Sequence, residues 1–158
     1  MRPNAWKRTL ATVTAVAGLA AGSLAGASAG VAAPAESAKI PSAAAAYPTC
    51  NSAKTVDAGT TYGTVRQPYY TGTGSRNCVM GIGARSAGVT RLQLNLNACY
   101  GRIGVHLTVD GVYGTNTSNA VKAVQRHVGV AADGIYGPMT RRSMNWDTSR
   151  LGCQNLGI

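Results

Sequence analysis

The sequence predicts a mainly α fold: a small three-helix bundle with a duplicated loop-helix unit, plus a small disulfide-bonded segment that contains β-strands. Three observations predict this fold. An eight-residue motif at 110–117 recurs at 133–140, with Asp, Gly, Tyr, Gly and Thr at matching places. Apolar residues recur at intervals of three and four in stretches that end near glycines. The chain also contains four cysteines: Cys50, Cys78, Cys99 and Cys153.

Residues 1–29 have the pattern of a secretory signal peptide. Three basic residues precede a long uncharged stretch rich in Ala and Gly. Cleavage is expected after Ala29, with rival sites after Ala27 and Ala33, and an uncleaved membrane anchor is the alternative. Residues 30–48 are expected to form a flexible linker, because they are rich in Ala, Pro and Ser and hold almost no large apolar side chain. We therefore expect export, with no stable membrane insertion after signal cleavage.

Residues 49–85 are expected to form a small β-containing segment. They are rich in Thr, Gly and Tyr and contain a short alternating run at 62–67. Pro68 indicates that the strand beside it is an edge strand or ends there. We expect the tyrosines of this segment to pack on the helices, because a small domain needs its aromatic residues for a core. The alternative is that their rings face a sugar.

Residues 86–158 are expected to carry the helices. The first helix is predicted over 86–100 from apolar residues three and four positions apart, and Gly101 is expected to end it. Leucines at the alternate positions 92, 94 and 96 leave a strand open as the alternative. The helix is preferred because the longer pattern and the C-terminal glycine agree.

Two further helices are expected to follow the two motifs. The second should run from Thr115 to about Val128, with Gly129 ending it. The third should start at Pro138, because Pro is favoured at the first helical position. Three side chains that face the core, and an aromatic residue near the end of this helix, complete the predicted bundle: Met139, Ser143, Met144 and Trp146.

Each position of the motif has a physical role. Asp110 and Asp133 are expected to accept hydrogen bonds from backbone N–H groups just ahead of them. The first glycine of each motif permits a positive φ, and the second suits a helix N-cap. Tyr113 and Tyr136 are expected to project an apolar ring with a polar tip. The alternative is that the whole motif is turn architecture.

The cysteines predict a disulfide framework rather than a metal site. An even count in an exported chain of this size is typical of disulfides, and four cysteines allow three pairings. We favour two bridges: Cys50 with Cys78, and Cys99 with Cys153. Each is expected to stabilise the fold by about 3–4 kcal/mol. No metal or cofactor is expected, because no Cys-x-x-Cys pair occurs and His106 and His127 are isolated.

The charge of the chain favours an anionic partner. Fifteen Lys and Arg residues stand against five Asp and Glu residues, which gives a net charge of +10. Three of the cations precede the predicted cleavage site, so twelve cations and five acids leave the mature chain at +7. Outside a cell, such a charge favours anionic polymers such as wall polysaccharides. Nucleic acid is not an expected partner because no nucleic-acid motif is present. The pair Arg141-Arg142 is expected to form a solvated helix face.

The combined pattern resembles the peptidoglycan-binding-like domain of bacterial wall proteins. The resemblance extends from Val89 to Met144 and rests on three stretches: Val89-x-x-Leu92-Gln93-x-x-Leu96, Asp110-Gly-x-Tyr-Gly-x-x-Thr117-x-x-Ala120-Val121-x-x-x-Gln125, and Asp133-Gly-x-Tyr-Gly-x-x-Thr140. One departure is Val124, where the family commonly carries an aromatic residue before the glutamine. The additional cysteines look like those of small exported actinobacterial members.

The resemblance implies a module that is not itself catalytic and that holds wall hydrolases on peptidoglycan through a shallow groove of helices and loops. Carried over by position, six residues are the candidate ligand-binding residues: Asp110, Tyr113, Gln125, Arg126, Asp133 and Tyr136. Aromatic faces suit sugar rings, and an arginine can pair with stem-peptide carboxylates.

No complete catalytic set for cutting a bacterial wall is visible in the sequence. A zinc peptidase needs about three protein ligands and a base, and neither His-Glu-x-x-His nor an equivalent spacing occurs. The most similar carboxylates, Asp110 and Asp133, occupy turn positions, and all cysteines are expected to be bridged. We expect a secreted, non-catalytic protein, extracellular or associated with the cell wall, that binds peptidoglycan or a related anionic wall glycan. A secreted protein partner, a basic inhibitor and a peptidoglycan hydrolase are the alternatives.

Overall fold

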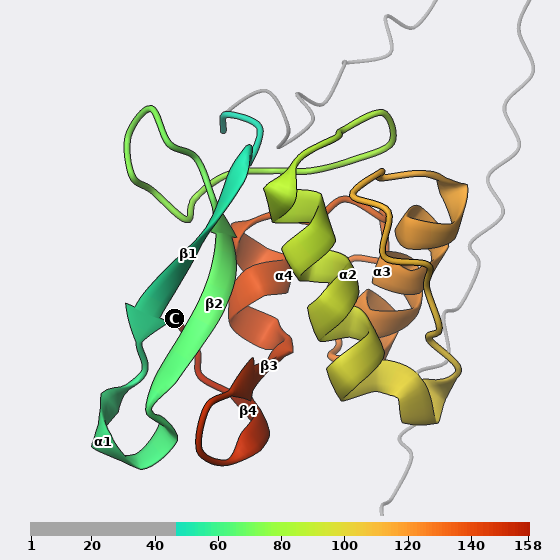
Figure 1. Ribbon diagram of the computed structural model, residues 1–158. Helices are drawn as coiled ribbons and strands as arrows, with labels where there is room; N and C mark the ends of the chain where they lie inside the picture. Colours follow the sequence, from blue (N-terminus) through green and yellow to red (C-terminus); the bar gives the residue numbers. More distant parts are fainter. Residues whose placement is uncertain (1–46) are drawn as a thin grey trace, which may run out of the picture. The chain divides into compact units, whose positions relative to one another are not determined.

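The computed structural model describes residues 47–158. The predicted signal peptide (1–29) and almost all of the predicted linker (30–48) lie outside the described residues. Four strands, four α-helices and one 3₁₀ turn follow one another along this part of the chain (Figure 1): β1 (Ser52–Asp57), α1 (Gly59–Tyr62), β2 (Thr64–Tyr69), α2 (Ala87–Tyr100), η2 (Gly101–Ile103), α3 (Thr115–His127), α4 (Pro138–Ser143), β3 (Asn145–Thr148) and β4 (Gly152–Asn155).

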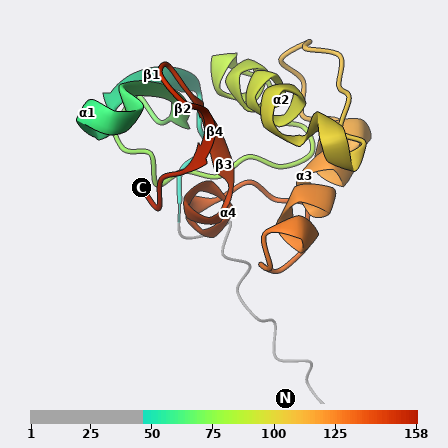
Figure 2. The same cartoon turned by 90° about the horizontal axis from the view of Figure 1, so that it is seen from below.

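The predicted fold class, a mainly α three-helix bundle, is wrong. The four strands form one antiparallel sheet in the order β1-β2-β3-β4, and α2 packs against all four of them. Figure 2 shows the sheet on one side of the described part of the chain, with α2 and α3 on the other. The predicted β-containing segment supplies only β1 and β2. The other half of the sheet comes from the C-terminal residues that were assigned to the helical part.

The hairpin of β3 and β4 was missed because α4 is short. Met144 leaves the helix with extended backbone, at φ −81° and ψ 156°. From there the buried side chains alternate along the chain: Met144, Trp146 and Thr148. A period of two is that of a strand, so Trp146 lies in β3 and not near the end of a helix. Thr148 pairs with Val65 of β2 and joins the two hairpins.

Gly101 ends α2, as predicted; its backbone stays helical (φ −55°, ψ −35°) and starts η2, which ends at Gly104 with φ 84°. One detail of the predicted helices changes. Met139 was expected in the core but is 66% exposed, because Thr140 and Arg141 take the inward positions of α4. The predictions of α2 and α3 are otherwise confirmed, and the 46% exposure of Leu94 fits a helix rather than an alternating strand.

Strand β2 explains how a proline is accommodated in the sheet. Pro68 lies opposite Ala53 of β1. On the other side, β3 pairs with β2 only at Val65, so at Pro68 the strand has a partner on one side only. The strand therefore behaves as an edge at this position, although the sheet continues beyond it elsewhere.

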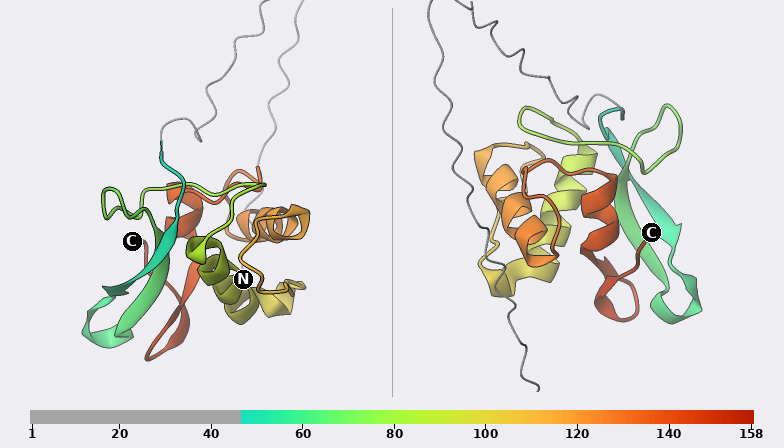
Figure 3. Two further views of the ribbon diagram at one scale, coloured as in Figure 1. Left: turned by 45° about the horizontal axis from the view of Figure 1, so that its top comes forward. Right: turned by 180° about the vertical axis from the view of Figure 1, so that it is seen from behind.

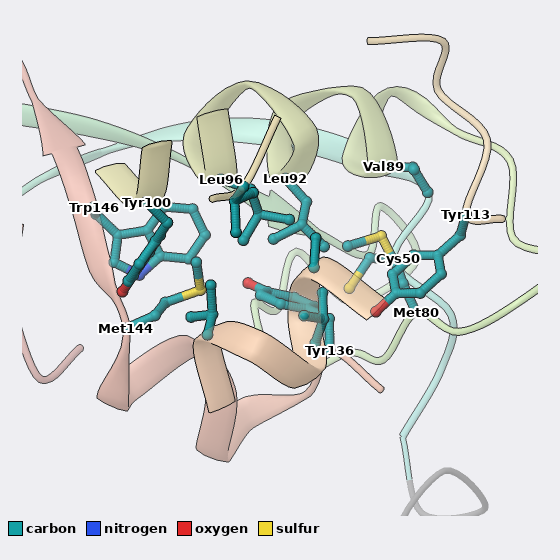
Figure 4. Packing of buried hydrophobic residues seen from close by; sticks show 14 of the residues in the cluster. Cys50, Met80, Val89, Leu92, Leu96, Tyr100, Tyr113, Tyr136, Met144 and Trp146 are labelled. Carbon is teal, nitrogen blue, oxygen red and sulfur yellow. The ribbon is translucent and has the colours of Figure 1, made fainter. Parts of the chain in front are cut away.

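One hydrophobic core joins the sheet to the helices. Its largest buried side chains come from both halves of the described sequence (Figure 4): Met80, Leu92, Leu96, Tyr100, Tyr113, Tyr136, Met144 and Trp146. The two disulfides have the pairing favoured from the sequence. Cys50 is bonded to Cys78, and Cys99 at the end of α2 is bonded to Cys153 in β4. Within residues 47–158, no helix is long and apolar enough to cross a membrane.

Candidate functional site

The second motif is held by a buried glutamine. Gln125 of α3 is 1% exposed, and its Oε1 accepts a hydrogen bond from the N–H of Gly134 at 2.8 Å. Its Nε2 lies 2.8 Å from Asp133 Oδ1, 2.9 Å from the Ile135 carbonyl oxygen and 3.0 Å from Thr140 Oγ1. Asp133 Oδ1 also accepts the N–H of Ile135 at 2.8 Å. We call this arrangement of Gln125, Asp133, Gly134 and Thr140 the second lock.

The first motif is held in the same way by a glutamine that was not predicted as a site residue. Gln93 of α2 is 1% exposed, accepts the N–H of Gly111 at 2.9 Å and lies 2.8 Å from Asp110 Oδ1. Its Nε2 also reaches the Val112 carbonyl oxygen at 3.1 Å and Thr117 Oγ1 at 3.2 Å. Gln93, Asp110, Gly111 and Thr117 form the first lock.

A repeated helix pattern in the sequence carried the signal for Gln93. The pattern Val89-x-x-Leu92-Gln93-x-x-Leu96 recurs as Val121-x-x-Val124-Gln125-x-x-Val128. The duplicated unit is therefore longer than the eight-residue motif: it is a helix that presents a glutamine to the loop that follows it.

In both locks, the residues that the two motifs share hold the loop in place. The hydrogen bond from Gln93, and next that from the N–H of Val112, hold the pKa of the Asp110 carboxyl below its ordinary value. Gly111 has φ 72°, and a side chain there would place Cβ 2.8 Å from Thr90 Oγ1, so only glycine fits. Asp110, Asp133 and Gln125 were predicted as ligand-binding residues, and in the structure their hydrogen bonds hold the two loops.

The tyrosines of the motifs do not present their rings to solvent. Tyr113 and Tyr136 are both 0% exposed, in contrast to the expected role of their rings at a groove. The reason is that the backbone of each pairs with segment 80–84: the N–H of Tyr136 donates to the Met80 carbonyl at 2.9 Å, and that of Tyr113 to the Ala84 carbonyl at 2.8 Å. Both rings consequently point into the core (Figure 4).

A hollow lies over each lock. The larger one, of about 530 Å³, is lined by residues of α3, of α4 and of the loop between them, and we call it the α3–α4 hollow. Figure 3 shows how this loop leads from α3 into α4. Lock residues form part of its lining, and the rest is mainly apolar with one arginine: Tyr47, Val79, Val130, Ile135, Met139 and Arg142. Met139 is 66% and Tyr47 39% exposed, so large apolar side chains stand open to solvent at this hollow.

The corresponding hollow over the first lock has a different chemistry. It has a volume of about 380 Å³ and is called the α2–α3 hollow. Its lining contains the equivalent lock residues together with several polar side chains: His106, Thr108, Thr115 and Asn116. The structure therefore separates the predicted site residues into two places, with Asp110 at one hollow and Gln125 and Asp133 at the other.

The arginine at the α3–α4 hollow is not the one expected. Arg126 is exposed on α3 but is not among the residues that line either hollow, whereas Arg142 of α4 lines the larger one. The prediction that Arg141 and Arg142 form a solvated pair is half wrong, because Arg141 is only 3% exposed. Adjacent side chains of an α-helix point about 100° apart, so α4 can pack Arg141 inward while Arg142 stays exposed.

The described residues hold no reactive thiol and no group of metal-binding side chains. All four cysteines are in disulfides. No three residues among the histidines, cysteines and acids of 47–158 come together in a way that could hold a metal ion.

Comparison with known proteins identifies the central part of the chain. Residues 85–144 match the model of a family described as "Putative peptidoglycan binding domain". A "Probable N-acetylmuramoyl-L-alanine amidase" of Bacillus licheniformis is 41% identical over 63 residues, which are 38% of this chain and 18% of the relative. A zinc D-Ala-D-Ala carboxypeptidase of Streptomyces albus G is 35% identical over 100 residues, 63% of this chain and 35% of the relative. The chain thus spans well under half the length of these relatives.

Among solved structures, a peptidoglycan-binding protein from Clostridioides difficile in complex with glutamine hydroxamate matches 56% of this chain and 53% of its own chain. Its TM-score of 0.39 and identity of 24% are too low to support an argument about fold or site. The family match instead rests on sequence, over the stretch that holds both motifs and both lock glutamines. The segment from residue 85 to residue 144 therefore belongs to the peptidoglycan-binding domain family.

Proposed function

We propose that this protein is secreted and non-catalytic, and that it binds the stem peptides of bacterial peptidoglycan through the α3–α4 hollow. The observation that carries the proposal is the lining of this hollow. It contains exposed apolar side chains and one cationic side chain, that of Arg142. The family of residues 85–144 supports peptidoglycan as the polymer. The names of two relatives, an N-acetylmuramoyl-L-alanine amidase and a D-Ala-D-Ala carboxypeptidase, refer to alanine residues and therefore favour the peptide part of the wall as the ligand.

The chemistry of the hollow favours peptide over glycan. Small aliphatic side chains of a peptide can pack on Ile135 and Met139, and a free carboxylate can pair with the guanidinium of Arg142. Glycan binding was expected to use the rings of Tyr113 and Tyr136. Since both rings are buried, they provide no stacking surface for a sugar.

Three observations support a role without catalysis. The Oδ1 atoms of Asp110 and Asp133 each accept two hydrogen bonds within their locks. The thiols are oxidised to disulfides. The matched relatives are much longer, so their enzymatic activities do not transfer to this chain by similarity. The signal-like residues 1–29 and the paired cysteines support export to an oxidising compartment.

Co-sedimentation with purified sacculi tests the proposal. The oxidised mature protein is expected to pellet at low and at moderate salt, because the contacts in the hollow are largely apolar. Soluble stem peptide is expected to compete for pelleting, while glycan strands stripped of peptide are not. Arg142→Gln is expected to weaken binding about tenfold, the size of one charge-assisted hydrogen bond.

Matched variants control for net charge and for exposed apolar surface. Arg126→Gln removes the same charge from α3, outside the hollow, and is expected to bind normally. Met139→Ser is expected to weaken binding about tenfold, and Leu151→Ser, which removes a 52% exposed leucine from the turn between β3 and β4, is not. Pelleting that disappears at moderate salt, or competition by glycan alone, would contradict the proposal. The first result would favour a basic inhibitor that binds through charge.

A further inference from the structure

A buried polar cluster that contributes no residue to the lining of either hollow lies where α4 approaches the sheet. It contains Gln67 of β2, Arg76 and Asn77 of the following loop, Tyr136, and Arg141 of α4. Arg76 Nη1 donates to Gln67 Oε1 at 2.8 Å, and Arg141 Nη2 donates to Asn77 Oδ1 at 3.0 Å. Trp146 Nε1 donates to the Arg141 carbonyl at 2.9 Å, and its ring packs edge-on against Tyr136 with the ring centres 6.4 Å apart.

The cluster holds four buried polar atoms without a hydrogen-bond partner among the described residues: Gln67 Nε2, Tyr136 OH, Arg141 Nε and Arg141 Nη1. Their residues are nearly or fully buried, at 0%, 0% and 3% exposed. All four atoms can donate a hydrogen bond. The orientation of the Gln67 amide is fixed because its oxygen already accepts from Arg76, so its nitrogen is the group left over.

The cluster also holds positive charge without an internal counter-ion. Arg76 and Arg141 are close enough for each to act electrostatically on Tyr136. Burial is the main cause that lowers the pKa of the Arg141 guanidinium. The aspartates of residues 47–158 are engaged elsewhere: Asp57 caps Gly59, Asp110 and Asp133 belong to the locks, and Asp147 lies near Arg91.

We propose that Gln67, Arg76, Tyr136 and Arg141 enclose a small inorganic anion of the halide class. Four buried donors without a protein acceptor and two guanidinium groups in one cluster favour an anion over a cation. A single water must also place its own two hydrogens among these donors, whereas an anion accepts hydrogen bonds without donating any. A halide from solution would supply the acceptor and the charge that the core does not provide. None of these four residues lines either hollow, so the site is independent of peptidoglycan binding.

Thermal unfolding of the oxidised mature protein in chloride and in gluconate, at one ionic strength, tests the site. Gluconate is too large to enter the core. At chloride concentrations above the dissociation constant, Tm is expected to rise by about 5 °C for each tenfold increase in chloride concentration, because the anion binds only the folded chain. Bromide is expected to act similarly, and a crystal soaked in bromide should show an anomalous peak beside the Arg141 guanidinium.

Two variants separate the anion site from general packing. Tyr136→Phe keeps the ring but removes one donor, and is expected to weaken halide binding about tenfold. Gln67→Glu places a carboxylate between the arginines and is expected to fold without halide and to lose the chloride dependence of Tm. Arg142→Met, which removes an exposed charge from the same helix, should keep the wild-type dependence.

Equal Tm values for the wild type in chloride and in gluconate would overturn the proposal. Electron density for water without an anomalous bromide signal would do the same. A wild-type chloride dependence that survives in Gln67→Glu would also count against it, because the anion would then act at another place.

Discussion

The two copies of the duplicated unit share a lock and differ in the hollow above it. In each copy a buried glutamine holds an Asp, a Gly N–H and a Thr with distances that agree closely. Over the first lock the added residues are mostly polar, and over the second they are mostly apolar with Arg142. What the copies have in common therefore builds the loops, and what distinguishes them is the chemistry of the two hollows.

The tyrosines show the same contrast inside the core. Tyr113 OH donates to the Gly134 carbonyl at 2.9 Å, so the first copy is bonded to the loop of the second. Tyr136 OH has no such partner among the described residues and belongs to the buried cluster with Arg141. Equivalent positions in a repeat thus serve different purposes once the copies occupy different surroundings.

The largest expected effect comes from breaking the locks. Gln93→Ala and Gln125→Ala each leave a glycine N–H without its acceptor and remove the amide that donates to the Asp, a carbonyl and the Thr of the same lock. Each is expected to lower the free energy of unfolding by about 3 kcal/mol. Urea unfolding measures both. Gln154→Ala, in β4, should change it by less than about 0.5 kcal/mol. A loss below about 1 kcal/mol for only one of the two glutamines would show that the locks are not equivalent.

A smaller effect is expected from the tyrosine hydroxyls. Tyr113→Phe removes the hydrogen bond to Gly134 and should lower the free energy of unfolding by about 1 kcal/mol. Tyr136→Phe should have almost no effect in halide-free buffer, because its hydroxyl has no acceptor among residues 47–158. Neither variant should alter pelleting with sacculi, since both rings are buried. Weaker pelleting by Tyr113→Phe at full stability would restore a direct role in binding.

The smallest expected effect concerns pH. The pKa of Asp110 is lower in the folded chain than its ordinary value, so its ionised form stabilises the fold above about pH 4, and this stability is lost as pH falls through the lowered pKa. Asp110→Asn should therefore show a weaker fall in Tm between about pH 5 and pH 2 than the wild type. Identical pH profiles would mean that Gln93 does not favour the ionised carboxylate.

The sequence alone predicted the structural features that depend on local residue patterns. Residues three and four apart predicted α2 and α3, Pro138 marked the start of α4, and the cysteine pairing followed from where each bridge would be useful. The hairpin of β3 and β4 was not predicted, because its strands are four residues long and their pairing with β2 depends on Val65, far away in the sequence.

The candidate site was predicted only in part for the same reason. The motif located the loops, but the side chains that line the α3–α4 hollow come from separate parts of the chain, including Tyr47, Val79 and Arg142. Burial of Tyr113 and Tyr136 depends on their backbone pairing with segment 80–84, and no local pattern indicates this pairing. The repeated motif located the two loops, while the exposed residues that distinguish the two hollows lie outside its shared positions.

The central claim is that the α3–α4 hollow binds stem peptide. The most direct test is to record the amide chemical shifts of the labelled mature protein while soluble stem peptide or peptide-free glycan is added. We expect stem peptide to shift the amides of Val130, Met139 and Arg142, with little change at His106 and Asn116, and glycan to cause no comparable shifts. Shifts centred on His106 and Asn116, or a response to glycan alone, would contradict the assignment of the α3–α4 hollow as the peptide-binding site.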